Sequence, residues 1–337
     1  MSTNPALVVE QLNPSPLRHL GVLSREDRAR LQREHEAMPY INEPFLPRKG
    51  IGIIGGDSGI GKTPFNYQKV VAAATGMPFL GKPSVPSRVL YFDLEPGPIN
   101  FLDEFERSIG RSVPEDMFYT VQALDKPQDA RRIIEATRPN IVEIDTLRQF
   151  WPGMTKDNDV ASQALKLARN WTNEFDVFVN FIHHLKKPDR KDPPAGLRYI
   201  SVSEWFLQLE GARGLYNHTD LRVAVEKSDT PGIDLLIKYN FRNMGDSPLI
   251  ALRREYSDET GDACGYNLAP ISTVLSQERQ NFYNQLPADR DLTPKLMRDI
   301  SGLSRDTIYK AMAELNLYGL VVKPGRGVWR RTGSLVP

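Results

Sequence analysis

Cysteine is almost absent from the chain: Cys264 is the one residue of this type among 337. The composition therefore excludes a disulfide framework and a cysteine zinc site, and it is typical of a reducing compartment. The chain also lacks an apolar run long enough to span a bilayer and a recognisable signal peptide, so we expect a cytoplasmic protein. The formal net charge is only +1, which means that any nucleic-acid site must be locally basic.

The chain contains the glycine-rich segment GDSGIGKT, which fits the G-x-x-x-x-G-K-[ST] loop that binds nucleoside-triphosphate phosphates. An apolar run at 52–55 predicts a buried strand before it, and residues 66–74 predict a helix after it. This context disfavours a chance glycine-rich turn. Lys62 would neutralise phosphate charge and Thr63 would hold Mg²⁺. The backbone N–H groups would face the phosphates of ATP, so the expected nucleotide-binding residues are Gly56, Asp57, Ser58, Gly59, Ile60, Gly61, Lys62 and Thr63.

Two further strands end in acidic residues, at 88–95 and 140–147. Parallel strands place ligand-binding groups at their carboxyl ends. Glu95 would there activate the water that attacks the γ-phosphate, with Asp93 as the competing carboxylate. Asp145 would hold the water shell of Mg²⁺, whereas Glu143 alternates with it and can instead pair inside the fold. The alternative for each strand is an ordinary acidic terminus.

The strand expected at 176–182 ends in His183-His184. His184 would hydrogen-bond the γ-phosphate and report its presence to the next loop. A metal site at the histidine pair is disfavoured, because adjacent strand residues point to opposite faces. The loop at 185–199 is basic and proline-rich, and it is either a solvated linker or a mobile DNA contact. In the second case the contacting residues would be Lys186, Lys187, Arg190 and Lys191.

The segments around these strands are less informative. Residues 24–38 predict a charged helix, which is either a solvated surface or an arm on a neighbouring subunit. Residues 201–209 predict a helix, 211–214 a tight link, and 221–226, 233–238 and 248–253 late strands. Arg242 lies in a turn, where it is either simply exposed or able to reach a neighbouring subunit's nucleotide.

The polar stretch 257–275 marks a boundary, and three helices (277–286, 293–300 and 305–317) and a hairpin (319–331) follow. This order is that of a winged helix-turn-helix, with Ser304 as the N-cap of the third helix. Basic residues exceed acidic ones locally. The third helix would enter the major groove and the hairpin would grip the backbone, unless the module binds protein instead. The expected DNA contacts are Arg305, Thr307, Tyr309, Lys310, Lys323, Arg326 and Arg330.

Taken together, residues 52–255 resemble the RecA-like ATPases, and among them the RepA-type hexameric replicative helicases. The resemblance is carried by GGDSGIGKT, ATGMPFLG, VLYFDLEPG, NIVEIDTL and FIHHLKK. It implies an α/β fold, in which a RecA-like P-loop NTPase core has a mainly parallel twisted sheet flanked by helices. It also implies a homo-hexamer or another ring, with ATP at subunit interfaces and single-stranded DNA in a central channel.

The resemblance also assigns roles to individual residues. It makes Glu95 the catalytic glutamate, Asp145 the Mg²⁺ aspartate and His184 the γ-phosphate switch. Arg242 becomes the arginine that acts in the neighbouring site, with Arg213 as a rival. The sequence departs from the family at Asn240, where a basic residue is common, and the winged helix is not part of every such ATPase.

We therefore expect an N-terminal arm (1–45), an ATPase domain (46–258) and a winged-helix domain (276–333). The leading interpretation is an ATP- and Mg²⁺-dependent DNA helicase or translocase of plasmid or phage replication. The alternative is an ATP-switched DNA-binding regulator or loader that separates no strands. A small-molecule kinase has little support, because the chain combines an acid-ended second strand with a DNA-type module.

Overall fold

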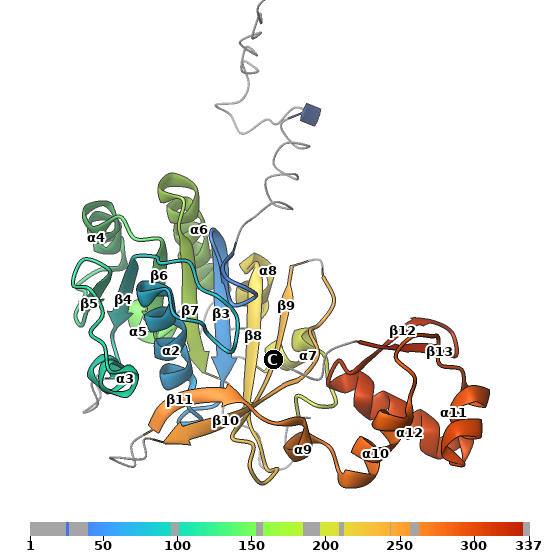
Figure 1. Cartoon of the computed structure of the whole chain (residues 1–337). Helices are drawn as coiled ribbons and strands as arrows, with labels where there is room; N and C mark the ends of the chain where they lie inside the picture. The colour runs from blue at the N-terminus through green and yellow to red at the C-terminus, as the bar shows by residue number, and fades with distance from the viewer. Residues whose placement is uncertain are drawn as a thin grey trace, which may run out of the picture. The chain divides into compact units, whose positions relative to one another are not determined.

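The computed structural model of the chain (Figure 1) describes residues 25–26, 40–95, 101–152, 158–184, 196–208, 212–242, 244–256 and 263–332. Two compact units are distinguished, Met1–Pro39 and Tyr40–Pro337. In the first unit the described residues are Arg25 and Glu26, which are helical and exposed. The helix expected at 24–38 otherwise lies outside the described residues.

The second unit is built on a sheet that has nine strands in the described part of the chain, in the order β11-β10-β9-β8-β3-β7-β6-β4-β5. The strands from β8 to β5 pair in parallel, and β9, β10 and β11 extend the β8 edge antiparallel. The mainly parallel sheet expected from the sequence is thereby confirmed. The bounds are β3 (Gly50–Gly56), β4 (Val89–Asp93), β5 (Phe118–Val121), β6 (Ile141–Asp145), β7 (Phe178–His184), β8 (Leu221–Lys227), β9 (Leu235–Phe241), β10 (Ile250–Tyr256) and β11 (Ala263–Leu268).

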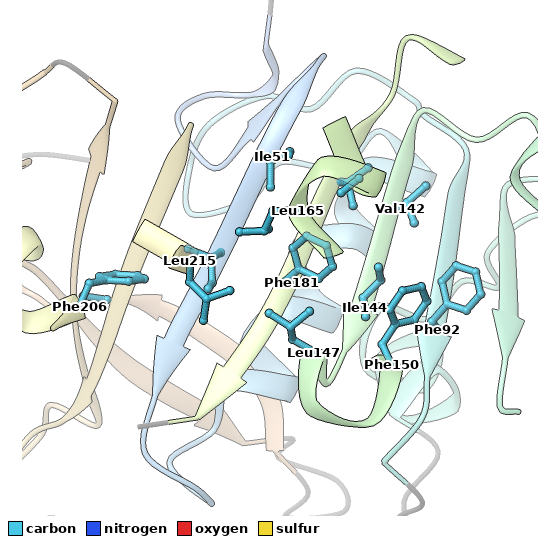
Figure 2. Close-up of a cluster of buried hydrophobic side chains, with 14 of the residues drawn as sticks. Ile51, Phe92, Val142, Ile144, Leu147, Phe150, Leu165, Phe181, Phe206 and Leu215 are labelled. Carbon is cyan, nitrogen blue, oxygen red and sulfur yellow. The ribbon is translucent and has the colours of Figure 1, made fainter. Parts of the chain in front are cut away.

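A separate antiparallel pair, β1 (Tyr40–Asn42) and β2 (Leu46–Pro47), precedes this sheet. Helices cover both faces of the sheet (Figure 1). One face carries α2 (Lys62–Thr75), which contacts β3 and β4, and α3 (Phe101–Ile109) beside it. The other face carries α4 (Ala130–Thr137), α5 (Leu147–Phe150), α6 (Asn158–Phe175), α7 (Val202–Phe206) and α8 (Ala212–His218). An apolar core lies on each face, and Figure 2 shows the one on the α6 side.

Alternation along the strands decides which side chains face α2. On β6, Ile144 points into the α6-side core (Figure 2), so its neighbours Glu143 and Asp145 face α2. On β4, Phe92 lies in the α6-side core (Figure 2) and Tyr91 in the α2-side core. Polar side chains of the parallel strands thus lie on the face of the sheet that α2 covers.

Two segments differ from the sequence-based expectation. The prediction of a tight link at 211–214 is wrong, because α8 begins at Ala212. Its Leu215 is fully buried where α8 packs on α6, and this burial outweighs the turn preference of the local glycines. The polar stretch 257–275 contains β11, which pairs with β10. The sheet therefore continues beyond residue 258.

The C-terminal helical segment, residues 271–332, has its own apolar core. Helix starts are set by side-chain caps: Thr293 accepts from the Leu296 N–H and Ser304 accepts from the Thr307 N–H. The three helices and the hairpin occur where the sequence predicts them. The elements are α9 (Ile271–Val274), α10 (Gln277–Gln285), α11 (Pro294–Ser301), α12 (Arg305–Leu317), β12 (Val321–Gly325) and β13 (Val328–Arg331). Across the described part of the chain, no helix combines the length and apolar character needed to cross a membrane.

Candidate nucleotide-binding site

The phosphate loop joins the end of β3 to the start of α2. Gly61 precedes the helix with φ 107°, a left-handed conformation that glycine adopts without strain. A Cβ atom there would lie 2.1 Å from the Tyr266 hydroxyl oxygen, so a larger residue does not fit. Among the described residues, no side chain caps α2 and no acidic residue lies in its first turn. The N–H groups and the positive end of the helix dipole are therefore available to an anion.

The Lys62 ammonium group lies at the carboxyl ends of the parallel strands, close to the end of β7. Its Nζ donates to the Asp57 carbonyl oxygen at 2.5 Å and lies 3.2 Å from Nδ1 of His184. Burial lowers the pKa of Lys62 to about 8, and the carboxylates of Asp145, Asp57 and Glu95 oppose this shift. Lys62 is thus mainly a cation at neutral pH, which suits a group that neutralises phosphate.

Thr63 and Asp145 meet at this edge from α2 and β6. Thr63 Oγ1 donates to Asp145 Oδ2 at 2.9 Å, and Tyr91 Oη donates to the same oxygen at 3.1 Å. The other oxygen, Oδ1, is buried and has no hydrogen-bond partner among the described residues. Burial raises the pKa of Asp145 to about 7, and the hydrogen bonds from Thr63 and Tyr91 oppose the rise. A carboxylate and a hydroxyl oxygen are the donor types that Mg²⁺ prefers, so these residues fit the expected ion.

Glu95 and Asp93 have different surroundings although both stand at the end of β4. The Glu95 carboxylate is half exposed, and its Oε2 lies 3.6 Å from Nε2 of His184. Because Nδ1 of His184 accepts from the Lys62 ammonium, its ring proton is on Nε2, toward Glu95. Burial and Lys62 lower the pKa of His184. Asp93 instead accepts a 3.0 Å hydrogen bond from the Tyr67 hydroxyl, so Glu95 is the carboxylate that joins the Lys62 cluster.

Glu143 pairs inside the fold, which is the alternative that the sequence left open. Its Oε1 lies 2.9 Å from the Lys69 ammonium, and both side chains are buried. The amide nitrogens of Asn66 and Asn180 donate to Oε2 at 3.0 and 2.7 Å. Burial lowers the pKa of Lys69, and Glu143 opposes this. The pair is a structural anchor beneath the site rather than a nucleotide contact.

Arg242 lies near the start of β3, at the opposite end of the parallel strands from the phosphate loop. Its N–H donates to the Asp220 carbonyl oxygen at 2.7 Å, and Asp220 Oδ2 accepts from the Ile51 N–H at 2.9 Å. Ile51 lies at the start of β3, whereas the phosphate loop follows the end of this strand of seven residues, about 20 Å away. The exposed Arg242 is therefore remote from the loop of its own chain. Its action in a neighbouring site stays a prediction.

The side chains of several other predicted site residues lie outside the described part of the chain. The side chain of Arg213, the rival of Arg242, is not among the described ones. The basic residues predicted to touch DNA after β7 fall outside the described residues as well: Lys186, Lys187, Arg190 and Lys191.

The basic side chains of the C-terminal helical segment are held to different degrees. The Arg330 guanidinium forms a 2.6 Å ion pair with Asp291. Lys323 Nζ lies 5.5 Å from the centre of the Trp329 ring, a cation–π contact. All four side chains are exposed, and within the described residues no ion pair or cation–π contact holds Lys310 or Arg326. The predicted DNA contacts of these residues stay predictions.

Three residues at the start of α12 have contacts within the segment. The Thr307 hydroxyl lies 2.8 Å from the Ser304 hydroxyl, so it takes part in the helix cap. The Tyr309 ring packs on Trp329 at 5.3 Å between centroids. The exposed Arg305 guanidinium lies 5.6 Å from the Tyr309 ring centre. Thr307 and Tyr309 thus stabilise the segment, whether or not they also touch DNA.

Sequence reasoning missed Tyr91 and Asn66, whose polar groups form the hydrogen-bond chain to Asp145, whereas Tyr67 holds Asp93 instead. A signal was available in the strand period, because Tyr91 alternates with Asp93 along β4 and thus faces the same side. Within the described residues, no cluster of three or more His, Cys, Asp or Glu side chains could hold a metal. Mg²⁺ bound to Thr63, with Asp145 holding its water shell, would therefore draw its other ligands from phosphate and water.

A family model described as an AAA domain matches residues 14–190 of the chain. Comparison with curated proteins finds no match. Among solved structures, the chain is similar to a KaiC-like protein from the hyperthermophilic archaeon Pyrococcus horikoshii OT3, at 13% identity and a TM-score of 0.45 over 68% of this chain and 94% of that one. It is also similar to a solved ATPase domain, at 15% identity and a TM-score of 0.48 over 71% of this chain and 97% of that one. Because the family match covers more than half of the 337 residues, the chain belongs to the AAA-domain family.

Proposed function

We propose that the protein is an ATP hydrolase that works on DNA, as a helicase or translocase of the RecA-like RepA type in plasmid or phage replication. Membership of the AAA-domain family supports nucleotide binding. The observation that carries the proposal is the meeting of Lys62, His184 and Glu95 with the Thr63–Asp145 pair at one edge of the sheet. A phosphate-binding cation, a magnesium site and a base for water are thus within reach of one another.

Each of these residues has a defined task in the proposed reaction. Lys62 and the N–H groups at the start of α2 bind the phosphates. Thr63 and Asp145 would hold Mg²⁺, which when bound would supply charge neutralisation at the phosphate oxygens. Glu95 accepts the proton of the attacking water as that water adds to the γ-phosphorus and the bond to ADP breaks.

The contact between Lys62 and His184 gives a route by which the γ-phosphate is sensed. In the structure, Lys62 Nζ contacts both the Asp57 carbonyl oxygen and His184 Nδ1. A γ-phosphate competes for the same ammonium group and frees the imidazole. Because His184 is the last residue of β7, a change in its position passes directly to the segment that begins at residue 185.

The position of Arg242 supports ATP sites shared between subunits. A ring that brings the end of one sheet that carries Arg242 to the phosphate loop of the next subunit would complete such a site. Arg242 then stabilises charge in the neighbour's transition state. Mixing inactive Lys62→Ala and Arg242→Ala subunits is expected to restore hydrolysis, since some interfaces then combine an intact loop with an intact arginine.

The DNA part of the proposal has two contact regions. Single-stranded DNA would pass through the channel of a homo-hexamer, beside the basic residues at 186–191. Duplex DNA would bind the C-terminal helical segment, whose α11, α12 and hairpin have the order of a winged helix. The exposed Lys310 and Arg326 support backbone contacts there.

A second candidate is an ATP-switched DNA-binding regulator or loader. The same C-terminal order of elements favours it, because winged helices read duplex sites rather than separate strands. ATP hydrolysis would then time assembly at a site and no unwinding would follow.

Hydrolysis of ATP tests the proposal. It is measured without DNA, with single-stranded DNA and with duplex, beside fork unwinding, with Lys62→Ala as the control. Stimulation by single strands together with ATP-dependent unwinding supports the helicase. Hydrolysis that only one duplex sequence stimulates, without unwinding, supports the regulator. The absence of Lys62-dependent hydrolysis under every condition contradicts both.

A further inference from the structure

The Asp145 carboxylate is held unevenly. Its Oδ2 receives hydroxyl hydrogen bonds from Thr63 at 2.9 Å and Tyr91 at 3.1 Å, whereas the buried Oδ1 has no hydrogen-bond partner in the described part of the chain. In the proposed nucleotide-bound state, the Thr63 hydroxyl would be a ligand of Mg²⁺ and would no longer donate to Asp145. Of the two hydroxyls on Oδ2, only that of Tyr91 then remains.

The proton of the Tyr91 hydroxyl has a fixed direction. The Asn66 amide nitrogen lies 3.3 Å from Tyr91 Oη and 3.0 Å from Glu143 Oε2. The amide must present its N–H₂ group to Glu143, because its oxygen would repel the carboxylate. Asn66 therefore donates to the Tyr91 oxygen, and the hydroxyl proton is left to Asp145. The buried Lys69–Glu143 ion pair anchors this chain of hydrogen bonds.

The ring of Tyr91 is fixed as firmly as its hydroxyl. The residue is completely buried, and its ring stacks on those of Tyr67 and Phe118, with centroids 4.3 and 6.1 Å away. On the neighbouring strand, Tyr91 is in register with Glu143. The hydroxyl therefore reaches the end of β6 from an immobilised platform on β4.

We propose that Tyr91 is a positioning residue for Mg²⁺ binding: it holds Oδ2 of Asp145 so that Oδ1 stays directed at the ion of the bound nucleotide. The inference rests on the proposed function, because it concerns the ion that accompanies ATP. Groups that orient a metal ligand in this way typically change metal affinity by about 10- to 100-fold when they are removed.

Tyr67 provides a matched control. It stacks on Tyr91 in the same aromatic group, and its hydroxyl also donates to a strand-end carboxylate, that of Asp93 at 3.0 Å. Tyr67→Phe and Tyr91→Phe remove the same atom from neighbouring rings. Only Tyr91→Phe removes a hydrogen bond from the carboxylate that faces the ion.

The experiment measures Mn²⁺ binding by electron paramagnetic resonance in the full chain loaded with ADP, and ADP affinity in the presence of EDTA. Tyr91→Phe is expected to weaken Mn²⁺ binding about 10-fold while ADP affinity without metal stays unchanged. Tyr67→Phe is expected to leave Mn²⁺ affinity as in the wild type. Equal Mn²⁺ affinity in the two variants overturns the inference.

A second variant keeps the test decisive if Tyr91→Phe fails to fold. Asn66→Ala keeps the Tyr91 hydroxyl but removes the donor that directs its proton toward Asp145. This variant should therefore weaken Mn²⁺ binding by a smaller factor than Tyr91→Phe. Unchanged Mn²⁺ affinity in Asn66→Ala then overturns the inference. If the wild type itself binds neither ADP nor nucleotide-dependent Mn²⁺, the proposed function fails as well, which separates the two failures.

Discussion

The phosphate-loop edge of the sheet and the C-terminal helical segment hold their charges in opposite ways. At the sheet edge, Lys62 and Asp145 are buried and meet groups from elements far apart in sequence. In the C-terminal segment, the ion pair of Arg330 with Asp291 is roughly half exposed on both sides. Charges removed from water interact strongly and can change the chemistry of their neighbours, whereas exposed charges are screened and adaptable. The first arrangement suits catalysis, and the second suits contact with a charged polymer.

Removal of the buried cation of the phosphate loop should have the largest effect. We expect Lys62→Ala to lower ATP hydrolysis by at least about 10³-fold, because phosphate charge in the transition state loses its main fixed cation. Steady-state phosphate release measures this. Lys49→Ala is the matched control, since Lys49 precedes the same strand but forms a surface pair with Asp176 at 3.1 Å. Equal loss in both variants would contradict the role of Lys62.

The second substitution separates two carboxylates of the same strand end. Glu95→Gln should reduce turnover by about 10²- to 10³-fold, because the amide cannot accept the proton of water, while ATP still binds. Asp93→Asn should affect turnover far less, since Asp93 is bonded to Tyr67 rather than to the Lys62 cluster. Single-turnover hydrolysis and nucleotide binding are measured in both. Normal turnover in Glu95→Gln would remove this residue from its role.

A third pair of substitutions compares a buried with an exposed ion pair directly. Lys69→Met leaves the Glu143 carboxylate buried without its cation, and we expect the free energy of unfolding to fall by about 3–5 kcal/mol. Arg330→Met breaks the exposed pair with Asp291 and should cost at most about 1 kcal/mol. Urea unfolding of the two variants measures the difference. Similar losses would show that burial does not decide the strength of these pairs.

The same contrast explains how much the sequence could predict. The loop motif and the acid-ended strands were sufficient to place Lys62, Thr63 and Asp145 at one edge, because parallel strands deliver their ends together. The role of Tyr91 was not predictable in the same way. Alternation assigns Tyr91 and Asp145 to the same face of the sheet, but only the packing of α2 brings the Asn66 amide to the Tyr91 hydroxyl.

Local patterns also failed where tertiary contacts dominate. The glycines at 211–214 predicted a link, yet the burial of Leu215 makes the segment part of α8. The polar character of 257–275 hid β11, whose Tyr266 N–H and carbonyl groups are both bonded to the Gln68 side chain on α2. In the C-terminal segment, by contrast, caps such as Ser304 are local signals, and the helices begin where these signals predict.

Acid should weaken magnesium binding at the buried edge. Burial raises the pKa of Asp145 to about 7, above the ordinary value of about 3.9, so its protonated form is favoured in the fold and its carboxylate is lost as the pH falls through 7. Mg²⁺ requires the carboxylate. Nucleotide-dependent Mg²⁺ affinity should therefore be about 10-fold weaker at pH 6 than at pH 8, because about a tenth of Asp145 is ionised at pH 6. Calorimetry measures the Mg²⁺ affinity of the wild type and of Asp145→Asn at each pH, and the variant corrects for titration of the nucleotide. An equal dependence of Mg²⁺ affinity on pH in the two proteins would contradict the prediction.

The smallest expected effect concerns one exposed arginine in the turn that joins β12 and β13. Arg326 is exposed, and within the described part of the chain no ion pair holds it, so its guanidinium can meet a DNA phosphate without breaking a contact. Arg326→Ala should reduce the slope of log affinity against log salt for duplex DNA by about one, uniformly across sequences. Arg330→Ala should change this slope less, because Asp291 already neutralises Arg330. Fluorescence anisotropy at several salt concentrations measures both slopes, and an unchanged slope in Arg326→Ala would mean that the hairpin does not touch the backbone.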